Sequence, residues 1–424
     1  MSARVDAYDT IRRDTLDRIE RRRLRPDADI DQVRTEVAAA VDEYQRHAHL
    51  GRVVPLHQPD VMLERVLRSI TDFGPLTELL GRRDVEEIFM EGPRVSFLDS
   101  GGRLRGLEAP TSEHENRQIV DRLLAPTDRP LNAKHPIVQA RVLDGTARLT
   151  AAIPPVGDRL SATVRRYTVR EVTLDDLVSR GTVSAAAARF LESLMQLRSR
   201  IIISGEPGAG KTTLAAALLA AAPPNHCVRC CEEIREIAVP VTHGGYYEVR
   251  PPGVDGTGEI TLRDLVKFVL AMRPDRIVVG EVRGGEAFEL TRAVNAGCGF
   301  LCTVHANGAP DALHALVNAA LMAGENITER VVRRVFAGGL DIVVHLERDE
   351  ADHKTGGVAP RSVKEIVAVL PSTSDEFTVE PLFRRASRGA ALEWSGIIPE
   401  SLAARLERAL GVSTRAVLDG RSQR

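Results

Sequence analysis

The 424-residue chain has little lysine, few aromatic residues and no long apolar run. Only five of its 57 basic residues are lysines, and aromatic residues make up 4% of the chain. No stretch approaches the ~20 consecutive apolar residues that a membrane span needs, and the first residues lack the apolar core of a signal peptide. The five cysteines are odd in number, which argues against a disulfide framework. We therefore expect a cytoplasmic protein whose contact with a membrane, if it has one, is peripheral.

The charge balance argues against a protein that binds polyanions over its whole surface. The chain has 57 basic and 59 acidic residues, for a formal net charge of -2. Hydrophobic residues account for 43% and charged residues for 27%, which is the composition of a globular protein. The length is too great for one ordinary core and suggests roughly two or three domains.

The residue pattern divides the chain into four stretches. Residues 1–65 are highly charged and predict helices with one modest apolar stripe, an N-terminal extension. Residues 66–170 combine short strand candidates with a helix, which predicts a smaller α+β domain. From 171 to 371 strands alternate with helices, the pattern of a parallel sheet with crossover helices. Residues 372–424 are weakly patterned, and we expect a C-terminal tail with one amphipathic helix near 398–410.

A phosphate-binding motif begins the strand–helix alternation. The stretch GEPGAGKTT matches G-x-x-x-x-G-K-[ST], follows an apolar strand and precedes an alanine-rich helix. Glycines let backbone N–H groups wrap a phosphate, and the helix N-terminus adds a favourable dipole. Lys211 is expected to reach the β- and γ-phosphate oxygens, and Thr212 to bind Mg²⁺. The predicted nucleotide-binding residues are Gly205, Glu206, Pro207, Gly208, Ala209, Gly210, Lys211, Thr212 and Thr213.

Two further stretches end apolar runs that would form strands of the same sheet. CVRCCEEIREI places Glu232 and Glu233 where carboxylates can face the nucleotide, beyond the carboxyl end of a strand. Because adjacent side chains of a strand point to opposite faces, only one of the two should face the nucleotide. A solvated acidic turn is the alternative. His305, in GFLCTVHANG, is either a structural hydrogen-bonding residue or a nucleotide sensor.

The stretch RIVVGEVRGGEA, residues 276–287, departs from the usual pattern of a nucleotide-binding strand. In place of a magnesium-holding aspartate it has Gly280 and then Glu281. The extra methylene of Glu281 lets it reach Mg²⁺ through a water, or orient the attacking water, and Gly280 leaves room for the phosphates. Arg283, on the same turn, is a candidate for neutralising phosphoryl charge.

These four stretches occur in the order of the Walker A, acidic, Walker B and histidine boxes, and the chain thereby resembles the type II/type IV secretion ATPase superfamily. The Gly-Glu ending followed by VRGGEA is similar to the CpaF-like branch, the motor ATPases of tight-adherence (Flp) pili. Softer matches, such as DVEEIFMEGPRV upstream and LMAGENI downstream, extend the resemblance over most of residues 73–371.

The resemblance implies an α/β fold: a RecA-like P-loop ATPase domain preceded by a smaller α+β, PAS-like N-terminal domain. Such subunits form hexameric rings at the cytoplasmic face of the inner membrane. There, hydrolysis of Mg-ATP drives domain motions that move pilin through a membrane platform. The family pattern assigns the attacking water and the Mg²⁺ shell to Glu281 and to Glu232 or Glu233, and assigns sensing of the γ-phosphate to His305.

The resemblance also implies that arginines from the N-terminal domain, or from an adjacent subunit, close the site. The candidates are Arg141, Arg148, Arg165 and Arg166. The alternative is that several of them pair with surface carboxylates. The hairpin DGTAR is one residue longer than the common DGSR pattern, which leaves the mapping of Arg148 open.

Two other functions stay open from the sequence. A nucleic-acid translocase or conjugative DNA-transfer ATPase has the same motifs, but the balanced charge and the lack of an aromatic, basic groove argue against DNA contact. The second open function is a nucleotide-switched scaffold with little turnover. The intact carboxylates Glu232, Glu233 and Glu281 argue against this function.

Overall fold

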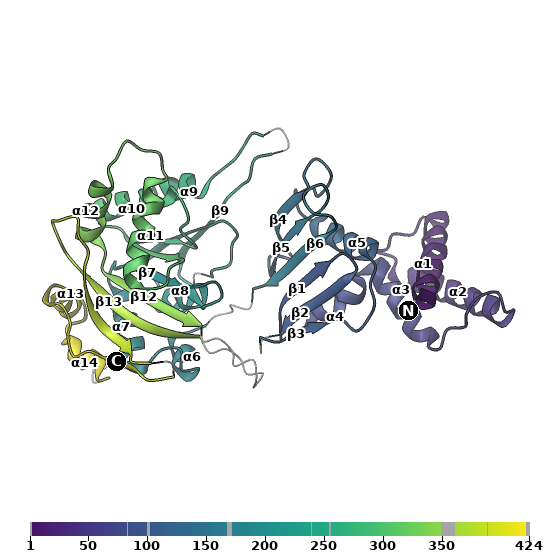
Figure 1. Ribbon diagram of the computed structural model, residues 1–424, viewed down its shortest axis with the longest axis horizontal. Coiled ribbons are helices and arrows are strands. Elements are labelled where there is room, and N and C mark those ends of the chain that lie inside the picture. The colour runs from purple at the N-terminus through teal and green to yellow at the C-terminus, as the bar shows by residue number, and fades with distance from the viewer. Residues whose placement is uncertain are drawn as a thin grey trace. The chain divides into compact units, whose positions relative to one another are not determined.

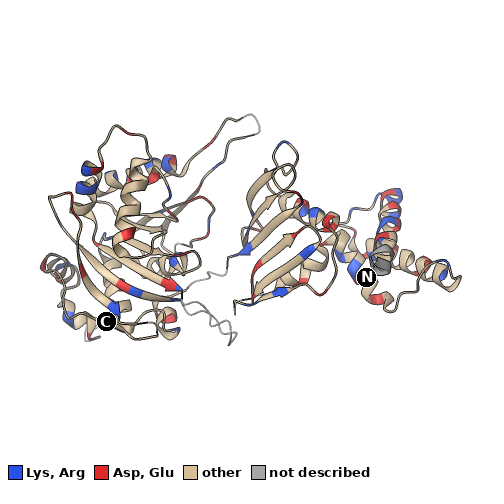
Figure 2. Cartoon of the chain, viewed as in Figure 1, with Lys and Arg blue, Asp and Glu red and all other residues tan. Residues whose placement is uncertain are grey.

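The chain is divided into two compact units, Met1–Thr168 and Val169–Arg424, each with a sheet of its own (Figure 1). This computed structural model describes residues 2–82, 84–99, 102–167, 172–238, 240–253, 256–348, 361–387 and 389–420. Among these residues, no helix combines the length and apolar character needed to cross a membrane. Basic and acidic residues are interspersed over both units (Figure 2).

The first unit begins with three helices that pack on one another. Val33, Val37 and Val41, at helical spacing in α2, are buried in a common apolar cluster with residues of α1 and α3. Tyr8 of α1 donates a hydrogen bond of 2.7 Å to Glu115 of α5, so the N-terminal helices are tied to the rest of the unit. The helices are α1 (Ser2–Arg22), α2 (Ile30–His49), α3 (Pro59–Thr71), the 3-10 helix η1 (Gly74–Leu76), α4 (Thr77–Gly81) and α5 (Glu113–Leu124).

A six-stranded antiparallel sheet, in the order β3-β2-β1-β6-β5-β4, completes the first unit. Buried and exposed residues alternate along β4, as expected for a sheet with one face on the core and one face open. The covered face shares a core with residues of α5. The strands are β1 (Val85–Glu91), β2 (Arg94–Asp99), β3 (Leu104–Gly106), β4 (Ile137–Val142), β5 (Ala147–Ala152) and β6 (Ser161–Arg166).

The second unit is a three-layer α/β structure around a nine-stranded sheet, as the strand–helix alternation predicts. Six strands run parallel in the order β9-β8-β10-β11-β7-β12, and β13, β14 and β15 continue the sheet antiparallel. The parallel strands are β7 (Arg200–Gly205), β8 (Cys227–Glu232), β9 (His243–Glu248), β10 (Arg276–Val279), β11 (Gly299–Val304) and β12 (Ile342–Arg348). The antiparallel strands are β13 (Arg361–Leu370), β14 (Thr378–Arg385) and β15 (Leu392–Trp394).

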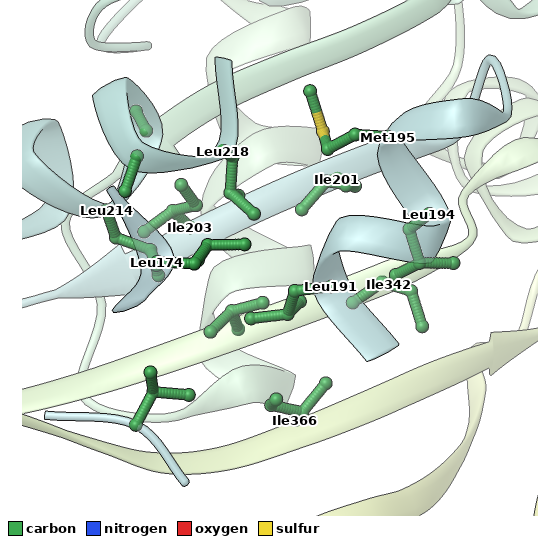
Figure 3. Close-up of a cluster of buried hydrophobic side chains, with 14 of the residues drawn as sticks. Leu174, Leu191, Leu194, Met195, Ile201, Ile203, Leu214, Leu218, Ile342 and Ile366 are labelled. Atoms are coloured by element: carbon green, nitrogen blue, oxygen red, sulfur yellow. The ribbon is translucent and has the colours of Figure 1, made fainter. Parts of the chain in front are cut away.

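Helices cover both faces of this sheet. One face shares a core with residues of α6 (Leu174–Ser179), α7 (Ala185–Gln196), α8 (Lys211–Ala220), α13 (Glu400–Leu410) and α14 (Thr414–Leu418). The other shares a core with α9 (Leu262–Leu270), α10 (Glu286–Asn295), α11 (Ala309–Leu321) and α12 (Glu329–Gly339). Successive residues of β7 alternate between the two cores, with Ile201 and Ile203 in the first (Figure 3) and Ile202 in the second. This is why the strand reads as a continuous apolar run.

The expectation of a weakly patterned tail from residue 372 is wrong. β14 pairs with β13 and β15 pairs with β14, so this segment extends the sheet, and Leu382 and Phe383 are buried in its core. Charged residues and Pro381 hide the apolar alternation of β14 in the sequence. The strand tolerates Pro381 because this residue lies at a shift in the register with β13. The helix expected near 398–410 is α13, and α14 follows it.

Candidate functional site

The loop between β7 and α8 has the backbone conformation of a phosphate cradle. Gly205, Gly208 and Gly210 have φ values of +152°, +76° and +96°, which residues other than glycine rarely adopt. A Cβ atom on Gly205 would also lie 2.5 Å from the Leu346 carbonyl oxygen of the paired strand β12. The glycine spacing thus shapes the loop for two reasons, the backbone conformation and the close approach of β12.

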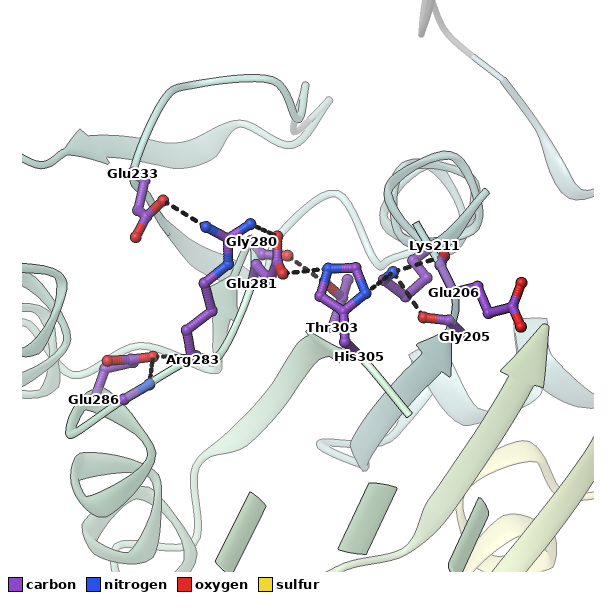
Figure 4. A network of polar contacts seen from close by, with 11 residues as sticks. Gly205, Glu206, Lys211, Glu233, Gly280, Glu281, Arg283, Glu286, Thr303 and His305 are labelled. Atoms are coloured by element: carbon purple, nitrogen blue, oxygen red, sulfur yellow. Dashed lines mark hydrogen bonds and ion pairs between the residues drawn. The ribbon is translucent and has the colours of Figure 1, made fainter. Parts of the chain in front are cut away.

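Lys211 opens α8 and its ammonium group is held inside the loop. The residue is 7% exposed. Its Nζ donates hydrogen bonds to the carbonyl oxygens of Gly205, at 2.9 Å, and Glu206, at 3.1 Å. Nζ also lies 3.2 Å from Nδ1 of His305, at the end of β11 (Figure 4). A buried ammonium group needs such partners because its removal from water costs several kcal/mol.

His305 links Lys211 to Glu281. Its Nε2 lies 2.5 Å from Glu281 Oε1, on the opposite side of the ring from the lysine (Figure 4). An ammonium group can only donate, so Nδ1 accepts from Lys211, which leaves the ring proton on Nε2, the nitrogen in close contact with the carboxylate. The contact with Lys211 therefore selects one neutral tautomer of His305.

Glu281 and Arg283 lie on the turn that follows β10. Arg283 donates to Glu281 Oε2 at 2.8 Å and reaches Glu233 Oε2 at 3.5 Å. Burial favours the neutral form of Glu281, but the hydrogen bond and charge of Arg283, with the charge of Lys211, outweigh it and lower the pKa of Glu281. Glu281 is therefore an ionised carboxylate, held between a cation and the histidine.

The adjacent carboxylates Glu232 and Glu233 have different surroundings, because Glu232 ends β8 and Glu233 lies on the bend that follows. Glu232 is 4% exposed and accepts backbone N–H bonds from Glu236 at 3.2 Å and Ile237 at 3.2 Å. Burial raises the pKa of Glu232 to about 7, although those hydrogen bonds oppose the rise. Glu233 is exposed and paired with Arg283.

Gly280 serves a different purpose from the one expected. A Cβ atom there would lie 2.7 Å from Cγ of Glu232, so the space beside Gly280 is occupied by this side chain rather than left for phosphates. The glycine is what allows a buried glutamate on β8 next to the end of β10.

Two residues that sequence reasoning missed hold the turn carrying Glu281. Glu286, at the start of α10, accepts backbone N–H bonds from Arg283 at 2.6 Å and Gly284 at 2.7 Å. Thr303 of β11 donates its hydroxyl to the Gly280 carbonyl oxygen at 2.6 Å (Figure 4). The rule that acidic residues favour the first turn of a helix could have indicated Glu286. No local signal indicates Thr303, because its role depends on the pairing of distant strands.

In the first unit, three of the four candidate arginines form a row across the sheet. Arg141 of β4 lies opposite Arg148 of β5, which lies opposite Arg165 of β6. Residues directly opposite share a face, and this is the open face. Arg165 lies next to Glu87 of β1 and approaches its carboxylate at 3.5 Å, so one predicted surface pair is present. The remaining candidate, Arg166, follows Arg165 on the strand and therefore points to the other face, where Nη1 donates to the Arg82 carbonyl oxygen.

Comparison with known proteins gives one match that covers the sheet of the first unit and the second unit as far as β12. The family model described as "Type II/IV secretion system protein" matches residues 70–349. A putative conjugal transfer protein of Mycobacterium tuberculosis H37Rv is 34% identical over 301 residues, 68% of this chain and 84% of that protein. The type IV secretion system protein VirB11 of Bartonella quintana is 26% identical over 332 residues, 69% of this chain and 92% of that protein. Among solved structures, the pilus retraction motor PilT with bound ADP matches with a TM-score of 0.51 at 18% identity, over 71% of this chain and 83% of that one. That match shows the fold.

Replacing Glu232 by glutamine should change how stability depends on pH. The folded chain keeps a proton on Glu232 up to its pKa of about 7, whereas the unfolded chain loses it near the ordinary value of 4.5. The free energy of unfolding therefore falls as pH rises from about 4.5 to about 7, by roughly 3 kcal/mol at most. Glu232→Gln has no titrating group here, so it should gain stability relative to the wild type over that range.

Urea unfolding at pH 5, 6, 7 and 8 measures this difference, with Trp394 of β15, the single tryptophan, as the fluorescent probe of the second unit. The matched control is Glu233→Gln, because that neighbouring carboxylate is exposed and should leave the pH dependence unchanged. Parallel pH profiles for the wild type and Glu232→Gln would contradict the burial argument.

Proposed function

The chain belongs to the type II/IV secretion system protein family, and we propose that within it the protein is an ATP-hydrolysing motor of the CpaF-like, pilus-assembly branch. The observation that carries the hydrolytic part of the proposal is the continuous contact Lys211–His305–Glu281 (Figure 4), which joins the phosphate loop to the carboxylate that follows β10. The branch rests on the resemblance of the stretch VRGGEA. A scaffold that only binds nucleotide has no need of an ionised carboxylate coupled to its phosphate-binding lysine.

The loop 205–213 suits the binding of Mg-ATP. Backbone N–H groups at the start of α8 suit the β-phosphate, and Lys211 would exchange its carbonyl partners for phosphate oxygens. Magnesium prefers oxygen ligands and shares them with substrate phosphates. Thr212, in the first turn of α8, and Glu281, through a water, would supply those oxygens. The bound metal would neutralise charge on the phosphates.

Glu281 is the residue we assign to the attacking water. Its lowered pKa keeps it able to accept a hydrogen bond from that water at neutral pH. Arg283 holds the carboxylate in place, and would also add positive charge beside bound phosphates. Glu232 has the second role: its carboxylate orders the turn 233–237 through backbone hydrogen bonds, rather than facing the water.

His305 is suited to sense whether the γ-phosphate is present. When Lys211 turns to a phosphate, Nδ1 of His305 would lose its donor, and the close contact between Nε2 and Glu281 Oε1 would be free to rearrange. Occupancy of the phosphate loop and the orientation of Glu281 would in this way be coupled through one ring.

The row Arg141–Arg148–Arg165 is suited to complete the site from the first unit or from a neighbouring subunit. The three guanidinium groups lie on one face of the sheet, and arginine is suited to bind phosphate oxygens. We propose a ring of copies, a hexamer, at the cytoplasmic face of the inner membrane, where the motor works on a membrane platform. Each copy would offer its arginine row to a nucleotide site.

A conjugative DNA-transfer ATPase is the second candidate function. It is favoured by the printed description of the Mycobacterium tuberculosis relative as a putative conjugal transfer protein. The two functions share the hydrolytic site and differ in the substrate moved.

Lys211→Ala and Glu281→Gln should each lower ATP hydrolysis by the assembled protein by roughly 100-fold or more, because one removes phosphate binding and the other the group that orients the water. Phosphate release measures both. Lys267→Ala and Glu259→Gln alter exposed residues of the same unit and are the controls. Hydrolysis at the wild-type rate in both site variants would refute the assignment. A wild type that assembles with nucleotide and releases no phosphate would instead be a nucleotide-switched scaffold.

Arg165→Ala and Arg148→Ala should lower kcat by roughly 10- to 100-fold with little change in KM, because the arginines act on charge that develops during phosphoryl transfer. Arg94→Ala, an exposed arginine on β2 of the same sheet, is the control. The role is excluded if the double variant keeps the wild-type kcat.

Single-stranded DNA should leave the hydrolysis rate unchanged if the motor acts on pilin. The measurement is phosphate release with and without DNA at two salt concentrations, because DNA binding through phosphates weakens steeply with salt. Stimulation that disappears at the higher salt concentration would favour the conjugative function.

A further inference from the structure

Two arginines flank the phosphate loop on the side away from the catalytic carboxylates. A Cβ atom built on Gly208 would lie 3.2 Å from Nη1 of Arg348, and one built on Gly210 would lie 3.6 Å from Cδ of Arg361. Arg348 ends β12 and Arg361 begins β13. Neither belongs to a motif that the sequence singled out.

The two side chains lie on the same face of the sheet. Arg348 and Arg361 are directly opposite one another in the antiparallel pair β12–β13, and residues so paired share a face. Leu346, two residues before Arg348, also approaches Gly210, at 3.9 Å from a Cβ atom built there. The pair therefore places two positive charges side by side against the outer flank of the loop. The acidic neighbour Glu347 is paired with Lys364.

The order of the strands indicates which part of a nucleotide would lie there. β7, which leads into the loop, is paired with β11 on one side and with β12 on the other. His305 and Glu281 follow β11 and β10, so the terminal phosphate belongs to that side. A nucleotide whose β-phosphate lies in the loop and whose γ-phosphate points toward Glu281 extends its nucleoside end in the other direction, toward β12 and β13.

We propose that Arg348 and Arg361 bind the nucleoside end of the nucleotide, with their guanidinium planes against the purine ring. This rests on the proposed nucleotide site. Guanidinium groups stack on flat π-systems and keep their charge at any working pH, so the contact needs no particular phosphate. The pair contributes equally to the binding of ATP and ADP and takes no part in hydrolysis.

The experiment compares Arg348→Ala and Arg361→Ala with the wild-type full-length chain. Titration calorimetry gives the Kd for ADP and for inorganic tripolyphosphate, and phosphate release gives KM and kcat for ATP. We expect the Kd for ADP and the KM for ATP to rise by the same factor, about five- to tenfold for each arginine. The kcat and the Kd for tripolyphosphate, which lacks a nucleoside, should stay as in the wild type. Arg384→Ala, an exposed arginine on the next strand β14, is the charge-matched control.

Several outcomes would overturn the inference. Unchanged ADP affinity in both variants would show that the arginines do not contact the nucleotide. An equal loss of affinity for ADP and tripolyphosphate would show that they bind the phosphates and not the purine. Arg348→Lys and Arg361→Lys keep the positive charge but lose the planar guanidinium group. They replace the alanine variants if one of these fails to fold, and they should also weaken ADP binding. Failure of the proposed function is distinguishable, because then the wild type itself binds no nucleotide or Lys211→Ala binds it as well as the wild type.

Discussion

Burial of the Lys211 ammonium group is the constraint on which the arrangement of the site depends. A lysine 7% exposed requires hydrogen-bond acceptors, and it finds them in two loop carbonyl oxygens and in His305. Because the lysine can only donate, the histidine must present a bare Nδ1 to it, which leaves its ring proton on Nε2, in close contact with Glu281. One desolvated charge therefore sets the tautomer of the ring that follows β11, and with it the nitrogen that faces the carboxylate on the turn after β10.

Features that depend on short stretches of sequence could be predicted, and those that depend on distant pairing could not. The phosphate loop is visible in the sequence because positive φ values demand glycine at fixed places. The contact of Lys211 with His305 joins residues 94 positions apart. The role of Gly280 was misread for the same reason, because the side chain that fills its space comes from β8.

Several charged clusters of the chain arise from strand register. Residues 141, 148 and 165 are scattered in the sequence, yet two antiparallel pairings bring them into one row. The pairing of β12 with β13 does the same for Arg348 and Arg361, 13 positions apart in the chain. A slip of one residue in either register would move one member to the opposite face and disperse the charge. Turn lengths and core packing, which define register, thus determine electrostatics in both units.

The position of β7 in the middle of the sheet has a consequence for a chain still being synthesised. The Ser204 hydroxyl, near the end of β7, is hydrogen-bonded to His345 of β12, 141 residues later, and Gly205 is paired with Leu346 of β12. A nascent chain that ends before β12 carries the complete phosphate loop but has one edge of β7 unpaired. Exposed apolar strand edges favour association with other chains. The growing polypeptide therefore stops exposing this edge only after β12 has been synthesised.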